Sequence, residues 1–374
     1  MTTRLKEYRQ FINDGMEVIA KTERITQSFT SCGADVCIIK SPLNLRYLTG
    51  IKLEDSMAVL TATGRKILLT DGRYGEICAK NLLPVDFEVL VTDDIYAVLA
   101  KIAKAEGFTS AALETDYITM DIFCALKEIG CAEKIVPISQ KLRAIRSVKS
   151  DEEIKNIRTA QQIGEASFNK LLTKVRVGMS EKEIAAKLTQ LLLKNGSDNG
   201  EFGICCVSGE NSSLVHGGAT DKKIQKGDNI LLDFGAIYKG YYSDMTRTFC
   251  VGEPSQEFKA AYEVVKKANE QGIKQLRDGA VAGDIDAVAR GIIDGGGYKG
   301  MFVHSLGHGV GMDIHDAPRL APNSTDILRT GNVVTIEPGI YIPGRFGIRI
   351  EDMLGINEMG ADNFTSITKQ LIVP

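Results

Sequence analysis

Histidine is confined to one part of this chain of 374 residues, and the confinement limits how the chain can fold. All four histidines lie between positions 216 and 315, and the carboxylates Asp233, Asp244, Glu337 and Glu351 lie among them or shortly after them. A chain that uses histidine only for core packing should scatter it. Four carboxylates and one imidazole are about what two divalent cations need when they share a water molecule. We therefore expect the chemistry in the C-terminal half.

The composition is ordinary for a globular protein and argues against several kinds of partner. Hydrophobic residues make up 44% of the chain and charged residues 25%, with a net charge of −3. This balance offers no basic surface, so we expect no nucleic-acid partner and no membrane partner. No apolar run approaches the length of a membrane span. The charged start of the chain lacks an apolar signal core, which favours a cytoplasmic location.

The eight cysteines show no CxxC pair and no zinc-site spacing with histidine. Disulfide frameworks are typical of short secreted chains, and this chain fits neither description. We expect reduced thiols that are mostly buried. The adjacent pair Cys205-Cys206 is interpreted as two small core residues rather than as a redox site.

The first part of the chain alternates strand-like and helix-like runs, which is typical of an α/β domain. The predicted strands are 34–39, 57–61, 66–69, 87–91 and 110–113, and the predicted helices are 74–81 and 95–106. Two domains are the natural expectation at this chain length. We place the first domain at 1–147.

Two capping boxes mark the start of the second domain, which we place at 148–374. Ser150 with Glu153 and Ser180 with Glu183 each predict a helix start. Further helices are predicted at 256–277 and 285–293, and strands at 202–208, 229–237, 241–250, 333–342 and 347–356. The second domain is therefore expected to be α+β, with helices covering a mostly antiparallel sheet.

Two aspartates flank a predicted hairpin with its loop at 237–240. If the loop is centred between Tyr238 and Lys239, Asp233 lies directly across from Asp244. Opposite Cβ atoms in such a ladder are about 5 Å apart, close enough for two carboxylates to share one cation. The alternative is two solvated strand acids, which fits the apolar neighbours of Asp233 less well.

A second predicted hairpin, centred on Gly344, puts Glu337 opposite Glu351. Arg349 lies two residues before Glu351, so both side chains point to the same face. Taken alone, this pattern fits a solvated Arg/Glu face equally well. The aspartate hairpin favours a second pair of metal ligands.

Three histidines occur within twelve residues of the glycine-rich run HSLGHGVGMDIHDAP, at His304, His308 and His315. The glycines make a regular helix unfavourable and let the backbone approach a ligand closely. We interpret these histidines as site residues rather than core residues. His216 is isolated in GENSSLVHGG and is also compatible with a surface loop.

Together LDFGAIYKGYYSDMTRTF, HSLGHGVGMDIHDAP and the EPG…GIRIED run resemble the M24 metallopeptidases. SPLNLRYLTG and LLTDGRY further resemble the N-terminal domain of the Xaa-Pro aminopeptidase and prolidase branch. The resemblance covers nearly the whole chain. It implies an α/β N-terminal domain followed by an α+β pita-bread (creatinase/aminopeptidase-like) C-terminal catalytic domain.

The same resemblance implies a ligand set for two metal ions. Asp233 would chelate one metal, Asp244 and Glu351 would bridge both, and His308 and Glu337 would complete the second. An oxygen-rich set of this kind favours Mn²⁺, with Co²⁺, Zn²⁺ and Fe²⁺ as other candidates.

Roles in catalysis and substrate binding follow from the same resemblance. Glu337 would carry a proton from the nucleophile to the leaving nitrogen, and His315 would stabilise the tetrahedral intermediate. His216 is expected to assist catalysis as well. The pocket for the proline ring and the chain after it would be lined by His216, His304, Tyr341 and Arg349.

The expected activity is that of an Xaa-Pro aminopeptidase, because no obvious insertion closes the site. The alternative is an Xaa-Pro dipeptidase (prolidase). A non-catalytic binding protein on this fold, or a metal-independent hydrolase such as creatinase, is disfavoured because all five ligand positions are filled. We expect proline-containing peptides as substrates and a homodimer as the assembly. The segment before the first strand is expected to form an extra helix or a dimer contact.

Overall fold

The computed structural model describes residues 3–198 and 203–374. They form two compact units, Met1–Ile145 and Arg146–Pro374. The division lies two residues before the boundary expected from the sequence. Across the described residues, no helix combines the length and the apolar character needed to cross a membrane.

Unit 1 is an α/β layer, as the sequence predicted. It is built around one mixed sheet with the strand order β4-β3-β2-β1-β5-β6, in which β6 was not predicted. Its strands are β1 Val36–Ile39, β2 Met57–Thr61, β3 Lys66–Thr70, β4 Phe87–Val91, β5 Ser110–Leu113 and β6 Lys134–Pro137. Its helices are α1 Thr3–Thr30, α2 Pro42–Thr49, α3 Gly75–Leu82, α4 Ile95–Glu106 and α5 Met120–Glu128, with the short η1 Leu83–Val85. Helix α6, Ser139–Ser147, spans the division between the units.

The segment before the first strand is a helix, α1, as one of the two expectations had it. Helix α2 was not predicted, although the sequence carries its local start signals, Ser41 as the N-cap and Pro42 directly after it. Its start is fixed by Glu114, a fully buried carboxylate. That carboxylate accepts hydrogen bonds from the backbone N–H of Ser41 at 2.9 Å and from the amide of Asn44. A contact over this sequence distance is invisible to local pattern analysis.

Unit 2 is α+β, and every strand pairing among its described residues is antiparallel. Its helices are α7 Asp151–Leu172, α8 Glu181–Lys194, α9 Gln256–Ile273 and α10 Ala282–Ile293, with the short η2 Gly209–Ser213 and η3 Asp294–Tyr298. Its strands are β7 Cys205–Ser208, β8 Asn229–Phe234, β9 Ile237–Tyr238, β10 Tyr241–Tyr242, β11 Met245–Cys250, β12 Gly307–Gly309, β13 Asp316–Leu320, β14 Val333–Ile336, β15 Gly339–Ile342, β16 Phe346–Arg349, β17 Asp352–Asn357 and β18 Gly360–Asn363.

Both predicted capping boxes are present and start α7 and α8. At α7 the Ser150 hydroxyl accepts from the N–H of Glu153 at 3.3 Å, and the Glu153 carboxylate accepts from the N–H of Ser150 at 2.9 Å. The pair Ser180 and Glu183 repeats this arrangement at α8.

All eight cysteines are free thiols and five are buried, as expected.

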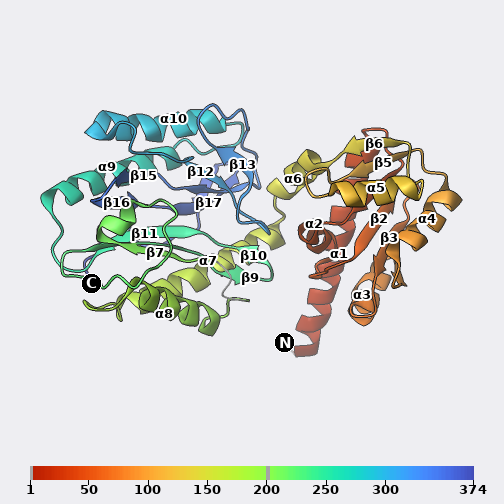
Figure 1. Cartoon of the computed structure of the whole chain (residues 1–374), viewed down its shortest axis with the longest axis horizontal. Helices are drawn as coiled ribbons and strands as arrows, with labels where there is room; N and C mark the ends of the chain where they lie inside the picture. Colours follow the sequence, from red (N-terminus) through yellow and green to blue (C-terminus); the bar gives the residue numbers. More distant parts are fainter. Residues whose placement is uncertain (1–2, 199–202) are drawn as a thin grey trace. The chain divides into compact units, whose positions relative to one another are not determined.

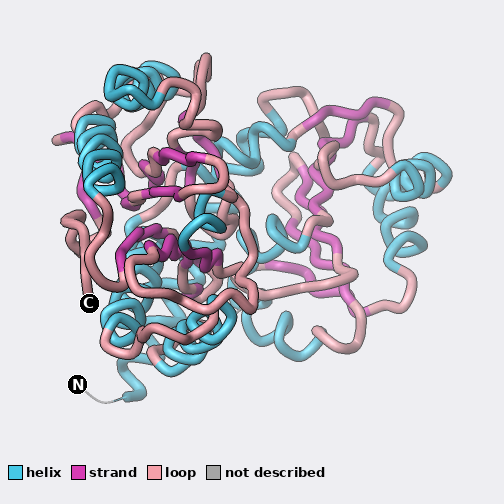
Figure 2. The backbone as a smooth tube through the Cα atoms, turned by 60° about the vertical axis from the view of Figure 1, so that its left-hand side comes forward, coloured by secondary structure: helices cyan, strands magenta, loops and turns pink. Residues whose placement is uncertain are grey.

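The strands of unit 2 lie between two pairs of helices (Figures 1 and 2). Helices α9 and α10 share one hydrophobic core with β14, β15, β16 and β17. Helices α7 and α8 share another with β7, β8 and β11. The ladders that the sequence places near the acidic residues therefore lie in the middle layer, where side chains are shielded from water on both sides.

Four strands that the sequence predicted as continuous are broken in the structure, and three of the breaks hold an acidic residue of the expected site. Asp244 lies between β10 and β11, Glu337 between β14 and β15, and Glu351 between β16 and β17. At two of the breaks the freed backbone carbonyls, those of Ile336 and Ile350, accept hydrogen bonds from the amide of Asn269 at 2.8 and 3.2 Å. The prediction of unbroken strands was wrong because this helix side chain replaces ladder partners.

The fully buried Arg247 ties strand β11 to the end of the chain. Its guanidinium donates to the carbonyl of Glu351 at 2.6 Å, to the carboxylate of Asp352 at 2.8 Å and to the carbonyl of Ile367 at 2.6 Å. This one side chain therefore fixes the backbone at one of the breaks.

We predict that Arg247→Met lowers the free energy of unfolding of unit 2 by about 3–5 kcal/mol, because it leaves buried acceptors without their cation. The measurement is urea unfolding followed by circular dichroism, with an unchanged m-value. Arg277→Met, which changes an exposed arginine, is the control and should stay within about 0.5 kcal/mol of the parent. Equal midpoints for the two variants would contradict the role of Arg247.

Candidate metal centre

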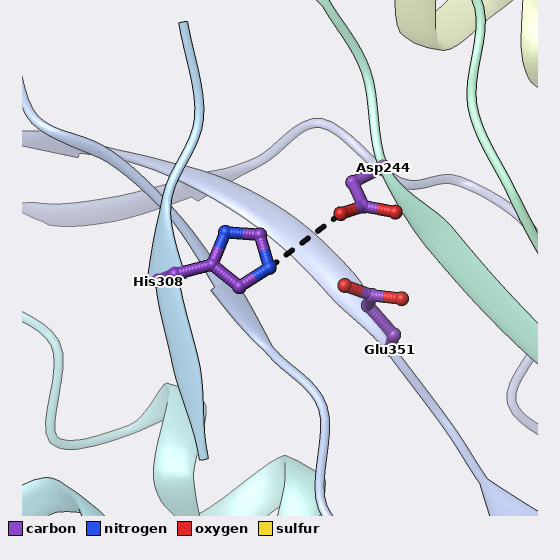
Figure 3. A group of neighbouring side chains, drawn as sticks. All are labelled: Asp244, His308 and Glu351. Carbon is purple, nitrogen blue, oxygen red and sulfur yellow. Dashed lines mark ion pairs between the residues drawn. The ribbon is translucent and has the colours of Figure 1, made fainter. Parts of the chain in front are cut away.

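Three of the five expected ligands converge in unit 2. The ligand atoms of Asp244, His308 and Glu351 all lie within 4.8 Å of one another. Figure 3 shows the imidazole of His308 directed toward the two carboxylates, with Nε2 3.6 Å from Oδ2 of Asp244. Glu337 joins them, because its Oε1 lies 3.3 Å from the same Nε2. Residues from distant parts of the chain thus form one acidic cluster.

The register predicted for the aspartate hairpin was wrong by two residues. The loop is Lys239-Gly240, where both residues have positive φ angles of 50° and 80°. Asp233 therefore lies opposite Thr246, and not opposite Asp244. Moving the loop centre by one residue shifts the register by two, which keeps every side chain on its face. Asp233 and Asp244 become diagonal rather than direct neighbours.

The register predicted for the glutamate hairpin is confirmed. Gly339 pairs with Arg349 in one ladder and Ile336 pairs with Asp352 in the next. Both pairs agree with the register that puts Glu337 across from Glu351. The two glutamates lie where one ladder ends and the other begins, and their own backbone N–H groups donate to Leu306 and Thr246, respectively.

His308 lies on β12, which the neighbouring strands confine closely. A Cβ atom added at Gly307 would lie 2.0 Å from the carbonyl oxygen of Thr335, and one at Gly309 would lie 2.1 Å from that of Ala317. Gly307 and Gly309 thus allow neighbouring strands to pack closely against β12. The sequence pattern had led us to expect that these glycines allow the backbone to approach a ligand. They hold His308 in place from both sides.

The electrostatics of the cluster fit a bound cation. Burial and the neighbouring carboxylates, above all Glu351, raise the pKa of Asp244 well above its usual range. Burial and Glu337 do the same to the pKa of Glu351. Buried like charges at this spacing are unfavourable unless protons or cations neutralise them. The cluster offers one imidazole nitrogen and several carboxylate oxygens as ligands, and such a set fits divalent metal ions.

Asp233, the fifth expected ligand, forms an ion pair with Arg349 in this structure. Its Oδ2 accepts from the guanidinium of Arg349 at 2.5 Å. Arg349 is buried and also donates to the hydroxyl of Thr246 at 3.1 Å, and that hydroxyl donates to Glu351 at 2.7 Å. Asp233 is therefore linked to the cluster through Arg349 and Thr246.

Three of the four residues expected to line the substrate pocket form a connected chain. The Tyr341 hydroxyl accepts from the guanidinium of Arg349 at 2.7 Å and lies 2.8 Å from Nε2 of His304. Nδ1 of His304 lies 3.9 Å from Glu337. Burial lowers the pKa of His304, although Glu337 opposes the shift. A neutral imidazole and a phenol thus lie beside the carboxylates.

The remaining two histidines are exposed. The His315 ring lies 4.5 Å from the His308 ring, measured between ring centres. His216 lies in the turn after η2, and its neighbour Val215 accepts from Arg349 through its carbonyl oxygen at 3.4 Å. The His315 side chain therefore lies directly beside the cluster, whereas His216 is held near it through Val215.

The sequence analysis gave no role to Thr246 or Arg319. Thr246 follows Asp244 by two residues, so strand alternation alone puts both on one face and could have revealed it. Arg319 lies opposite His308 in the ladder, and its exposed guanidinium donates to the hydroxyl of Ser305 at 3.1 Å. That pairing depends on a bulge in the register, which no sequence pattern reveals.

Asp316, next to His315, is buried between two cations. It lies 3.2 Å from a guanidinium nitrogen of Arg146 and 4.0 Å from the ammonium nitrogen of Lys149. These contacts fix the backbone that carries His315.

Two family models match the chain. The model of metallopeptidase family M24 matches residues 155–358, and the model of the creatinase/prolidase N-terminal domain matches residues 21–148. The two matches agree with the two units of the structure.

The chain is similar over most of its length to several proteins. A solved structure of an Xaa-Pro dipeptidase from Bacillus anthracis gives a TM-score of 0.91 at 36% identity, covering 96% of this chain and 100% of the other. That of an X-Pro aminopeptidase from Thermotoga maritima gives 0.86 at 32% identity, with coverages of 93% and 100%. An Xaa-Pro dipeptidase from Pyrococcus horikoshii is 33% identical over 94% of this chain and 98% of its own.

We predict that Asp244→Asn weakens Mn²⁺ binding to the metal-stripped protein at least about 100-fold, because a buried charge is lost from the cluster of expected ligands. The measurement is titration calorimetry, with metal content after dialysis as a second readout. Asp221→Asn, which changes an aspartate whose side chain is 86% exposed, is the matched control. Unchanged metal content in Asp244→Asn would remove this residue from the ligand set.

Proposed function

Since the chain belongs to metallopeptidase family M24, we propose that it hydrolyses the Xaa-Pro bond of dipeptides. Its two units are the creatinase/prolidase N-terminal domain and the pita-bread catalytic domain of that family. Hydrolysis of peptide bonds is therefore its reaction. The dipeptide as substrate is supported by similar proteins from Bacillus anthracis and Pyrococcus horikoshii that are named Xaa-Pro dipeptidases.

In this proposal the metal ligands are the five residues expected from the sequence. They are Asp233, Asp244, His308, Glu337 and Glu351. A pair of bound divalent cations supplies an acidified water and polarises the scissile carbonyl. Asp233 would exchange part of its contact with Arg349 for a cation. Mn²⁺ is our choice of metal, because four of the five ligands are carboxylates.

Two side chains would handle the proton and the developing charge. Glu337 lies against His308 and faces His304, so it is placed to take a proton from the attacking water and pass it to the leaving nitrogen. His315 lies beside His308 on the open side, where its imidazole can stabilise the oxyanion of the tetrahedral intermediate.

The proline side of the substrate needs a pocket without a partner for an amide N–H, because an Xaa-Pro bond has none. His304 and Tyr341 satisfy each other's polar atoms, and Phe302 packs edge-on against His304 with ring centres 5.0 Å apart. Of these three rings, His304 keeps a side-chain exposure of 18%, so it is the one placed to contact the pyrrolidine ring. His216 would close the pocket from the exposed turn.

The observation that carries the choice of a dipeptide is the position of Arg319. Its guanidinium is exposed, and among the described residues its hydrogen bonds go only to the hydroxyl of Ser305, which comes directly after His304 in the chain. A cation beside the proline pocket suits a free carboxylate, which a dipeptide presents directly after the proline ring. In a longer peptide this position holds a neutral amide.

An aminopeptidase acting on longer peptides is the second candidate, and it was the expectation from the sequence. It is supported by the similar X-Pro aminopeptidase from Thermotoga maritima. The two candidates share every catalytic residue and differ only in the substrate group that lies beyond the proline ring.

We predict that the Mn²⁺-loaded protein cleaves Ala-Pro at least about 100-fold more efficiently than Ala-Pro-Ala, because only the dipeptide offers a carboxylate to Arg319. Chromatography of the products gives kcat/KM for each. Arg319→Gln should raise KM for the dipeptide about 10-fold or more and leave the tripeptide unchanged, as expected for a charge-assisted hydrogen bond. Faster cleavage of the tripeptide would favour the aminopeptidase.

We predict that His216→Ala lowers kcat on Ala-Pro about 10–100-fold while the metal content stays that of the parent, because His216 contacts substrate and no metal in this proposal. Steady-state kinetics and metal analysis on the same preparation check both parts. Unchanged kinetics would remove His216 from the site.

The assembly and the location remain predictions. We propose a homodimer in the cytoplasm, as the sequence analysis expected.

A further inference from the structure

One carboxylate holds both ends of the segment that carries His216. Glu181, the first residue of α8, has a fully buried side chain. Its Oε1 accepts from the N–H and the hydroxyl of Ser208 at 2.7 and 2.8 Å. Its Oε2 accepts from the N–H and the hydroxyl of Thr220 at 2.9 and 2.6 Å. Each oxygen therefore binds one end of the segment 209–219, here called the His216 segment.

A fifth donor comes from within the segment, because the amide of Asn211 lies 3.3 and 3.5 Å from the two oxygens. Burial alone would raise the pKa of Glu181, but the hydrogen bonds from Thr220 and Ser208 hold it below its usual value. The side chain therefore stays ionised at neutral pH. Hydrogen bonds to an ionised acceptor are stronger than neutral ones, so both ends of the segment are held firmly.

The His216 segment contacts Arg349 on one side of His216 and strand β7 on the other. The carbonyl oxygen of Val215 accepts from Arg349 at 3.4 Å, and that of Gly217 accepts from the thiol of Cys205 at 3.1 Å. Gly217 is also tightly confined, since an added Cβ atom would lie 2.8 Å from a methyl group of Val207. The position of His216 thus depends on where the ends of the segment are fixed.

We propose that Glu181 is a positioning residue for the Xaa-Pro peptidase reaction, acting through His216 without touching substrate or metal. The inference rests on the proposed function, in which His216 binds substrate. The buried carboxylate sets the distance between Ser208 and Thr220, and this distance sets the reach of the His216 side chain into the proline pocket.

Glutamine at this position would release one end of the segment. A carboxamide has one oxygen, which can serve Ser208 or Thr220 but not both. Its NH₂ group would then face the backbone N–H of the other residue, donor against donor. The shape is preserved, so Glu181→Gln changes the hydrogen bonding with little change in packing.

We predict that Glu181→Gln lowers kcat/KM for Ala-Pro about 10-fold in the Mn²⁺-loaded protein, with the metal content unchanged. The double variant Glu181→Gln with His216→Ala should be no slower than His216→Ala alone, because the same contribution is lost only once. Multiplied losses in the double variant would overturn the proposal, since they would mean that Glu181 does not act through His216.

Amide hydrogen exchange gives a readout that is independent of the substrate. Peptides covering 209–219 should exchange faster in Glu181→Gln than in the parent, and unchanged exchange there would overturn the clamp. If the parent cleaves neither Ala-Pro nor Ala-Pro-Ala, the proposed function fails, whereas faster exchange of this segment still supports the clamp. Thr220→Val, which removes one hydroxyl donor, serves as a milder second variant should Glu181→Gln not fold.

A matched control is available in the same unit. Glu165 is also buried, and its carboxylate accepts from both the N–H and the hydroxyl of Ser366. Glu165→Gln should lower the melting temperature to a similar extent but leave kcat/KM within about twofold of the parent. Equal losses of kcat/KM in the two variants would indicate general destabilisation and overturn a specific role of Glu181.

Discussion

Repulsion among carboxylates in the middle layer of unit 2 is the constraint on which the rest of the site depends. Asp244 and Glu351 are buried, and Glu337 is more than half buried beside them. Buried like charges at this spacing are unfavourable unless protons or cations neutralise them. The protein supplies His308 and Arg349 as partners, and it leaves the rest of the charge to be balanced by bound cations.

The broken strands are the backbone counterpart of that constraint. A residue inside a regular ladder points its side chain at right angles to the sheet, so four ladders could not aim their acids at one point. Breaks at Asp244, Glu337 and Glu351 free the backbone to turn. Each break costs ladder hydrogen bonds, and Asn269 offsets part of this cost by donating to two of the carbonyls.

The sequence revealed the acids and their spacing but not the contacts that place them. The glutamate register could be derived from Gly344, because symmetry about one turn residue fixes all pairs. The aspartate register failed because the two positive φ angles lie at Lys239 and Gly240, and lysine carries no turn signal. The alternation of polar and apolar residues still gave the correct face, since a two-residue shift preserves it. Asn269 lies far in sequence from Ile336 and Ile350, so no local pattern reveals that it binds their carbonyl groups.

In the proposed function, substrate specificity depends on residues that surround the metal ligands. Catalysis needs carboxylates, an imidazole and a proton carrier, and such a set says nothing about the length of the peptide. In the proposed function, the discrimination between peptide lengths comes from the groups beyond the proline ring, where Arg319 presents a positive charge. The segment that carries His216 forms another part of the proposed pocket. By binding both ends of this segment, the buried carboxylate of Glu181 would hold it in one position.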